Sequence, residues 1–482
     1  MGLILWYNGE NWQEVCPMEY EHSLTYAVQM QVDGYIQARG AQAGARLNRC
    51  GSARELLPLL IDPETISTPG FVLRRHIQSQ GLVSGLDCAD LSRTGNVPWP
   101  EAVTQQAAAQ LSSLSYRRHR LAISTVNWYK YLTDAMPKGI QRGMIFKLAV
   151  VAGMGREETL ELLLACGESP YNVRRPLELL CWFCQGVSGV YTWADIQNLL
   201  ERYEAYAAQE AEGEAVRPEP VPDATRMLLD WANELLDPGL PSAPEARQRL
   251  LERMAQVRGE LQGFSRTAQA KYLRLTDYLR ALYTPPSPVL SELVRTMYHR
   301  QELFFDDVRM NSRGKLYMFR GEPADRFGPQ REEYVFGGGP GMNLLGKVAM
   351  FCKRYPLRVG GIAHGREAVD RRDILLLGYF LITGYRSAGA AERAAFWALA
   401  QEDGPMDRRI SLIREELDAL AKEPDIPERQ VRCRRVLNEL LAELNFQAFY
   451  VPALFDRWVL FALLTRRPSR TVCYFLGEDL GG

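Results

Sequence analysis

The sequence predicts a mainly α-helical, multi-domain protein, and three observations support this: its length, its apolar spacing and its shortage of strand signals. The chain has 482 residues, enough for roughly three domains of ordinary size. Many segments repeat apolar residues at intervals of three and four, which is typical of amphipathic helices. Hydrophobic residues make up 46% and charged residues 24% of the chain, so we expect a large core that needs no metal or disulfide crosslink.

Helical spacing recurs along the whole chain. The segments that carry it are 53–61, 104–114, 142–154, 156–167, 194–209, 224–236, 246–261 and 410–423. Two further helix starts are marked by a capping hydroxyl followed by proline. These are Thr68 with Pro69 and Ser287 with Pro288.

Strand and boundary signals are few. Two aromatic-rich runs flank the turn sequence NSRG between Glu302 and Gly321, which predicts a β-hairpin insert. The proline-rich stretch 211–224 predicts a linker, and 237–246 predicts a long loop. We therefore divide the chain into five parts. The first three are an N-terminal helical domain (1–105), a helix-turn-helix-like module (106–210) and a linker with a helical segment (211–285). The last two are a helix with the hairpin and a glycine-rich loop (286–365) and a C-terminal helical module (366–482).

One stretch has the spacing of a phosphate-binding loop. In "FGGGPGMNLLGKV", Gly341, Gly346 and Lys347 match the G-x-x-x-x-G-K pattern. A working loop also needs Ser or Thr after the lysine and a parallel sheet around it, but the next residue is Val348 and the chain lacks alternating strands and helices. We reject nucleotide hydrolysis and expect 337–347 to form a flexible turn between the hairpin and the next helix.

The other chemical motifs point to structure rather than catalysis. Cys181 and Cys184 form a CxxC inside an apolar helical stretch, with no second pair and no nearby histidine, so we expect buried thiols. The five histidines are far apart, and no serine elbow or carboxylate pair stands out. We therefore expect no enzyme activity, no metal and no cofactor.

We expect no signal peptide, because the first residues lack a basic segment and their apolar run is too short. The longest apolar run, which starts at Ile374, falls short of the ~20 residues that span a bilayer. Nine scattered cysteines fit a reducing compartment. We expect a cytoplasmic protein with no membrane contact. The formal net charge is −1, so any nucleic-acid surface has to be a local patch.

Two parts of the chain share one order of features, namely an arginine-led apolar helix, an amphipathic helix, an aromatic-bearing loop and a second apolar helix. This order predicts an internal duplication. The matched pairs include Arg142 with Arg371, Leu162 with Leu440, Leu163 with Leu441, Tyr171 with Phe449, Glu178 with Asp456 and Phe183 with Phe461.

The segment "LAISTVNWYKYLTDAMPKGIQRGMIFKLAVVAGMGREETLELLLACGESPY" resembles phage-repressor-type helix-turn-helix regulators from the second helix onward. It is more closely similar to a set of uncharacterised bacterial regulator-like proteins built on that module. The residues on the family's marks are Ser124, Tyr129, Arg142, Leu148, Ala149, Glu158, Thr159, Leu162 and Leu163. The resemblance implies a DNA-binding, regulator-like function for a duplicated helix-turn-helix-like module.

The residues themselves fit contact with DNA or RNA. Ser124 can cap a helix on which Asn127 and Lys130 share a face, and asparagine can bond adenine through two hydrogen bonds. Phosphate contacts would come from cations on either side. The candidate site is Arg117, Arg118, Arg120, Ser124, Asn127, Lys130 and Lys138.

Two alternatives remain open. In the first, the helix after Ser124 is a capped core helix whose polar face contacts only solvent. In the second, the protein is an interaction scaffold, with a protein partner or self-association, and its helix-turn-helix-like folds do not contact nucleic acid.

Overall fold

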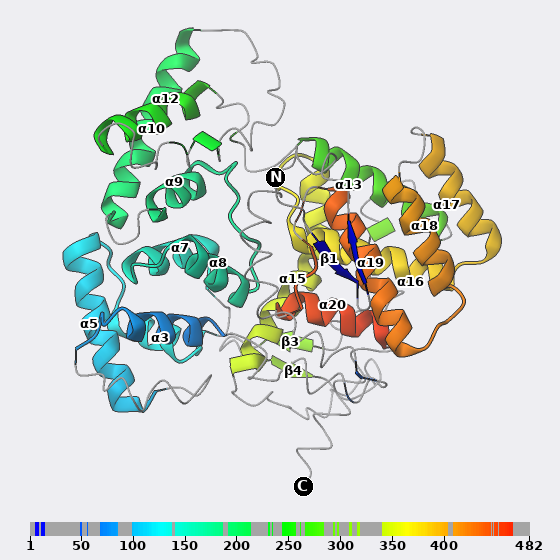
Figure 1. Cartoon of the computed structure of the whole chain (residues 1–482), viewed down its shortest axis with the longest axis horizontal. Coiled ribbons are helices and arrows are strands. Elements are labelled where there is room, and N and C mark those ends of the chain that lie inside the picture. The colour runs from blue at the N-terminus through cyan, green and yellow to red at the C-terminus, as the bar shows by residue number, and fades with distance from the viewer. Residues whose placement is uncertain are drawn as a thin grey trace, which may run out of the picture.

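A computed structural model describes residues 5–8, 11–14, 49–50, 55, 68–84, 99–136, 140–186, 191–213, 230–231, 234, 243–256, 261, 266–283, 293–294, 296–297, 308–310, 316–318, 340–402, 408–444, 446, 448–451 and 453–465. The described part is mainly helical, as the apolar spacing predicts, and its helices gather in two units (Figure 1). None of the described helices has both the length and the apolar composition needed to cross a lipid bilayer.

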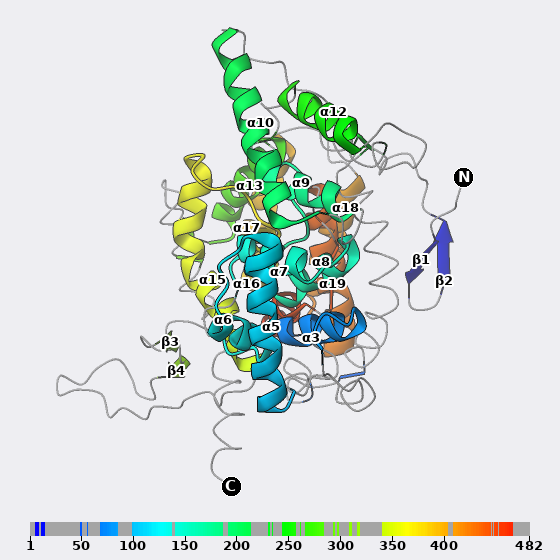
Figure 2. The ribbon, with the colours of Figure 1, turned by 90° about the vertical axis from the view of Figure 1, so that its left-hand side faces the viewer.

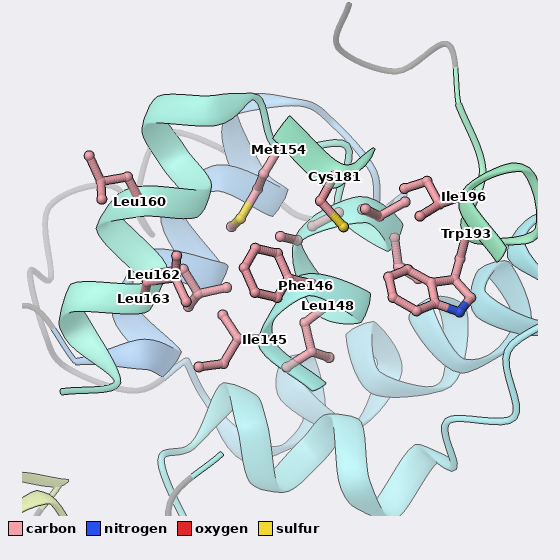
Figure 3. Packing of buried hydrophobic residues seen from close by; sticks show 14 of the residues in the cluster. Ile145, Phe146, Leu148, Met154, Leu160, Leu162, Leu163, Cys181, Trp193 and Ile196 are labelled. Atoms are coloured by element: carbon pink, nitrogen blue, oxygen red, sulfur yellow. The ribbon is translucent and has the colours of Figure 1, made fainter. Parts of the chain in front are cut away.

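The first unit is an assembly of short helices around one apolar core. Its helices are α3 (Pro69–Ser79), α5 (Glu101–His119), α6 (Thr125–Leu132), α7 (Arg142–Val151), α8 (Arg156–Ala165), α9 (Pro176–Gln185), α10 (Trp193–Gly213) and α12 (Ala243–Gln256). Helix α7 lies at the centre, and its Ile145, Phe146 and Leu148 point toward side chains of α8, α9 and α10 (Figure 3). Helix α5 runs along the outer edge of this unit, on the side away from the second unit (Figures 1 and 2).

The second unit surrounds an almost completely buried helix. Its helices are α13 (Arg266–Tyr278), α15 (Pro340–Ala363), α16 (Arg371–Ser387), α17 (Ala390–Glu402), α18 (Arg408–Leu420), α19 (Ile426–Glu443) and α20 (Leu454–Leu464), with a short 3-10 helix at Leu279–Ala281. Helix α16 packs against α18, α19 and α20, which bury it on several sides. A helix that is apolar on nearly every face needs such a position.

Local capping explains several helix starts. Thr68 accepts a hydrogen bond from the Phe71 N–H, and Pro69 is the first helical residue, which confirms the predicted start of α3. Asp370 and Asp373 form a reciprocal capping box at the start of α16. The predicted start at Ser287 and Pro288 lies outside the described residues, as do most of the predicted helices 53–61 and 224–236.

The described strands form two small antiparallel pairs. Strand β1 (Leu5–Asn8) pairs with β2 (Asn11–Glu14), and β3 (Val308–Met310) pairs with β4 (Leu316–Met318). The second pair falls inside the predicted hairpin, but its turn lies outside the described residues, so the insert as a whole stays a prediction.

The glycine-rich stretch corrects one expectation. Helix α15 begins at Pro340, so Gly341, Gly346 and Lys347 lie within a helix and not in a flexible turn. Proline favours the first position of a helix, because the N–H that it lacks would have no hydrogen-bond partner within the helix at that position. The backbone from 340 to 347 therefore does not form the loop that would wrap a phosphate.

The two units meet through polar groups and one apolar insertion. The Ser169 hydroxyl donates to Asp370 at 2.7 Å, and Arg372 donates to Glu168 at 3.2 Å. Tyr450 and Ala453, from the segment between α19 and α20, are buried in the core of the first unit. The five-part division of the chain stays a prediction. The described cores group residues into two clusters, one of 72–261 with this insertion and one of Cys50 with the remainder from 272 to 464.

Candidate nucleic-acid interface

The candidate interface lies where α5 ends and α6 begins. Helix α5 ends at His119, and Arg120 adopts the left-handed conformation with φ 53°. The Arg120 N–H donates to the Tyr116 carbonyl at 3.2 Å, and the Leu121 N–H donates to the Ser115 carbonyl at 2.9 Å. This is the usual way a helix closes its last carbonyls, although glycine is the residue that normally takes the left-handed position.

Helix α6 is a two-turn helix with one buried and one exposed face. Ser124 caps it, accepting a hydrogen bond from the Asn127 N–H at 3.2 Å. Trp128 is fully buried, and its indole N–H donates to the Ser115 hydroxyl of α5 at 2.9 Å. This anchor holds α6 in a fixed orientation against α5 and leaves the opposite side of α6 to solvent.

The side chains on the solvent side form what we call the α5–α6 surface. Its exposed members are Tyr116, Arg117, Arg118, Arg120, Ser124, Thr125, Val126, Asn127 and Lys130. All predicted site residues up to Lys130 are therefore exposed on one helical hairpin. Thr133 is only half-buried and returns its hydroxyl to the Tyr129 carbonyl. Lys138 lies outside the described residues.

The surface is positively charged over its own stretch of chain. The sequence has no Asp or Glu between Glu101 and Asp134. Glu101 stands at the other end of α5, about 27 Å away at a helical rise of 1.5 Å per residue. Asp134 is buried, where its carboxylate accepts from the Thr68 hydroxyl and the Gly70 N–H, both at 2.7 Å. Neither acid can therefore neutralise the arginines.

One acid from another element approaches the base of this surface. Asp195 of α10 is half-buried and caps its own helix, accepting from the Thr192 N–H and hydroxyl at 2.8 and 2.7 Å. It lies close enough to His119 to influence its charge. Among the described residues, no carboxylate forms an ion pair with Arg117, Arg120 or Lys130.

His119 is a neutral part of this support. It is buried, and its Nδ1 accepts a hydrogen bond from the Trp193 N–H at 3.3 Å. Burial and the neighbouring Arg118 lower the pKa of His119 to about 4, against the opposing effect of Asp195. The positive charge of the surface at neutral pH therefore comes from arginine and lysine alone.

The CxxC motif has a structural role, as its apolar setting predicts. Cys181 and Cys184 are buried on α9, and burial raises the pKa of both thiols. A thiolate that reacts or binds metal needs the opposite shift. Within the described ranges, no group of His, Cys, Asp and Glu has the arrangement of a metal site.

Two largely buried ion pairs have the same kinds of partners in the two units, although Arg142 presents Nε and Nη2 to its acid and Arg371 presents Nη1 and Nη2. Arg142 donates to the two carboxylate oxygens of Glu178 at 2.8 and 2.7 Å, and Arg371 donates to those of Asp456 at 2.7 and 2.6 Å. In both cases the acid also accepts from the backbone N–H six residues before it, at 2.6 Å. Each arginine also donates to a carbonyl of the loop that precedes its acid, namely Pro170 and Ala448.

Two features of the site are not visible in the sequence. The left-handed conformation of Arg120 has no signal, because arginine is not the residue expected there. The anchoring of Trp128 on Ser115 joins two helices whose contact the apolar spacing alone does not specify.

Comparison with protein-family models, curated proteins and solved structures found no match to this chain.

Proposed function

We propose that this protein is a non-enzymatic, regulator-like nucleic-acid-binding protein that contacts DNA or RNA through the α5–α6 surface. The observation that carries the proposal is the exposed cluster of Arg117, Arg118 and Arg120 beside a capped helix, in a stretch without accessible acids. Guanidinium groups bind phosphate through two parallel hydrogen bonds, so such a cluster suits a sugar–phosphate backbone.

The division of labour follows from position. The arginines at the end of α5 supply backbone contacts, while Asn127 and Lys130 on α6 face outward one turn apart. The Ser124 cap leaves the first turn of α6 open to an anion, which helix N-termini favour. Asn127 is the side chain suited to read a base edge.

The conformation of Arg120 supports the same function. A left-handed backbone favours glycine, and a non-glycine residue costs stability there. The guanidinium group of Arg120 is exposed and makes no ion pair within the described part of the chain. Among the described residues it therefore has no ion pair that would offset this cost, which is expected if its role is to contact a ligand.

A second candidate function is a protein-interaction scaffold. Tyr116 and Val126 expose 71% and 61% of their surfaces within the α5–α6 surface. Exposed aromatic and arginine side chains are also typical of protein interfaces. Under this alternative the same surface binds a protein partner or a second copy, and binding depends less steeply on salt.

We further propose that the two units derive from one duplicated helix-turn-helix-like module. The matched partners of the Arg142–Glu178 and Arg371–Asp456 pairs support this, because each acid accepts from its arginine and from the backbone N–H six residues before it. The second unit would then be a packing copy, since the α5–α6 surface belongs to the first unit alone.

The experiment is fluorescence anisotropy with labelled DNA and RNA at about 50 and 200 mM salt, because electrostatic binding weakens steeply over this range. The double variant that carries Arg117→Glu and Arg118→Glu should no longer bind labelled DNA or RNA. The matched control is Arg202→Glu with Arg249→Glu, which changes the net charge equally on exposed faces of α10 and α12. Failure of both nucleic acids to bind at low salt, or equal loss in both double variants, would refute the proposal.

A further inference from the structure

Tyr116 is an aromatic side chain that lies outside both described cores. It exposes 71% of its surface and is the one aromatic residue among the most exposed large apolar side chains of the described part of the chain. Within that part, its ring makes no ring–ring contact and no contact with a cation. By contrast, Tyr171, also in the first unit, is buried against Phe146 and Trp182.

We propose that Tyr116 is a stacking surface for an unpaired base, so that the ligand of the α5–α6 surface is a single-stranded stretch of nucleic acid. This inference rests on the proposed function and specifies its ligand class. Aromatic rings interleaved with cations are the arrangement that binds single strands, because each base offers a flat face and each nucleotide a phosphate.

The backbone places the ring at the turn between the two helices. Tyr116 lies one helical turn after Ser112, whose hydroxyl donates to the Ile123 carbonyl at 2.8 Å just before the Ser124 cap. Its own carbonyl accepts the Arg120 N–H that closes α5. The ring thus stands beside the α5–α6 turn, with Arg117 next to it in sequence and Arg120 one turn further on.

Rigid support makes the ring suitable for stacking. The neighbouring Ser115 is fully buried and holds Trp128, so the helical turn that carries Tyr116 is fixed to the core. A ring on a fixed backbone loses little freedom on binding, since only two side-chain torsions remain to be ordered.

The same geometry disfavours a duplex as the preferred ligand. Bases in a duplex are already stacked on their neighbours, so a ring beside the helix finds only edges and phosphates unless a base is flipped out. A duplex therefore uses the arginines and leaves Tyr116 in solvent. An unpaired strand uses both, which predicts tighter binding and a loss confined to single strands when the ring is removed.

The test measures affinity by anisotropy for one sequence of about 12 nucleotides as single-stranded DNA, as single-stranded RNA and as duplex DNA. The wild-type protein should bind one or both single strands at least about tenfold more tightly than the duplex. Tyr116→Ala should weaken single-strand binding about tenfold, in the range that loss of one base–aromatic stack produces. Tyr116→Phe should retain wild-type affinity, because the ring remains.

Two controls separate the possible results. Leu357→Ala, at an exposed apolar side chain of α15 outside the α5–α6 surface, should leave single-strand affinity unchanged. The salt dependence of Tyr116→Ala should equal that of wild type because no phosphate contact is lost. Equal binding of duplex and single strands, with no effect of Tyr116→Ala, would overturn this inference and leave the proposed function standing. Absence of binding to every oligonucleotide at low salt would overturn both, and Tyr116 would then be assigned to a protein partner.

Discussion

Replacing Arg120 by glycine should make the protein more stable and weaken its binding to nucleic acid. Arg120 has φ 53°, in the left-handed region. That region costs a residue other than glycine about 1–2 kcal/mol. Glycine gives back about 0.4–1 kcal/mol through the greater freedom of its unfolded chain. The expected net gain in the free energy of unfolding is about 0.5–1 kcal/mol.

The matched variant is Arg117→Gly, three residues earlier in the last turn of α5. It removes the same charge from the same cluster, but Arg117 is helical, so glycine there should cost about 0.5–1 kcal/mol. Both variants lose the same charge and the same side chain, so these two effects cancel when the stabilities of the variants are compared. Their stabilities should therefore differ by about 1–2 kcal/mol, with Arg120→Gly the more stable.

Urea unfolding, followed by circular dichroism and by hydrogen exchange over 101–132, measures the stability difference. Anisotropy at several salt concentrations measures binding. For one lost phosphate contact, each variant should lower the salt slope by about 0.7 on a single strand and by about 0.9 on a duplex. If Arg120→Gly destabilises the protein as much as Arg117→Gly does, the strain argument is wrong. If Arg120→Gly is more stable yet binds as wild type does, Arg120 has no role in the proposed interface.

Three further predictions follow from buried groups. Glu178→Gln and Asp456→Asn each break a buried ion pair with arginine. Each should lower the free energy of unfolding of its own unit by about 3 kcal/mol, measured by hydrogen exchange. A loss of stability in only one of the two variants would argue against equivalent roles. Because the pKa of His119 is lowered to about 4 in the folded protein, the unfolded state binds the proton more tightly, so stability is full above about pH 6.5 and falls by roughly 3 kcal/mol as the pH drops toward 4. Urea midpoints should show this slope flattened in His119→Gln and unchanged in the exposed-site control His364→Gln, and an unchanged slope in His119→Gln would exclude this histidine as its source. Gly70→Ala should cost about 1–3 kcal/mol by thermal unfolding, because the added methyl would lie 2.8 Å from the Leu132 carbonyl oxygen, and a neutral result would mean that α3 can shift.

Local signals predicted the fold where they act over a few residues. The Thr68 cap and the apolar spacing of α7, α8 and α18 correspond to helices in the structure. The glycine-rich stretch misled because its spacing matched a loop motif, whereas proline at the start and Met, Leu and Lys around the glycines support a helix.

Long-range features were less accessible. The sequence comparison matched Arg142 with Arg371 and Glu178 with Asp456, yet spacing alone does not show that each arginine contacts its acid across 36 or 85 residues. The exposure of Arg117, Arg118, Arg120, Asn127 and Lys130 was predictable from their polarity, whereas His119 is polar and yet buried. The conformation of Arg120 was not, because it depends on how the end of α5 is closed.

The insertion of Tyr450 and Ala453 into the first core means that the amino-terminal half of the molecule lacks part of its core when it is alone. A fragment ending at residue 261 would have an apolar notch on its surface, and we expect it to self-associate until the notch is filled. Adding the complementary fragment, or a synthetic peptide covering 446–453, should dissolve those aggregates and reconstitute the fold. During synthesis, the amino-terminal half can therefore complete its core only after the ribosome has translated residue 453.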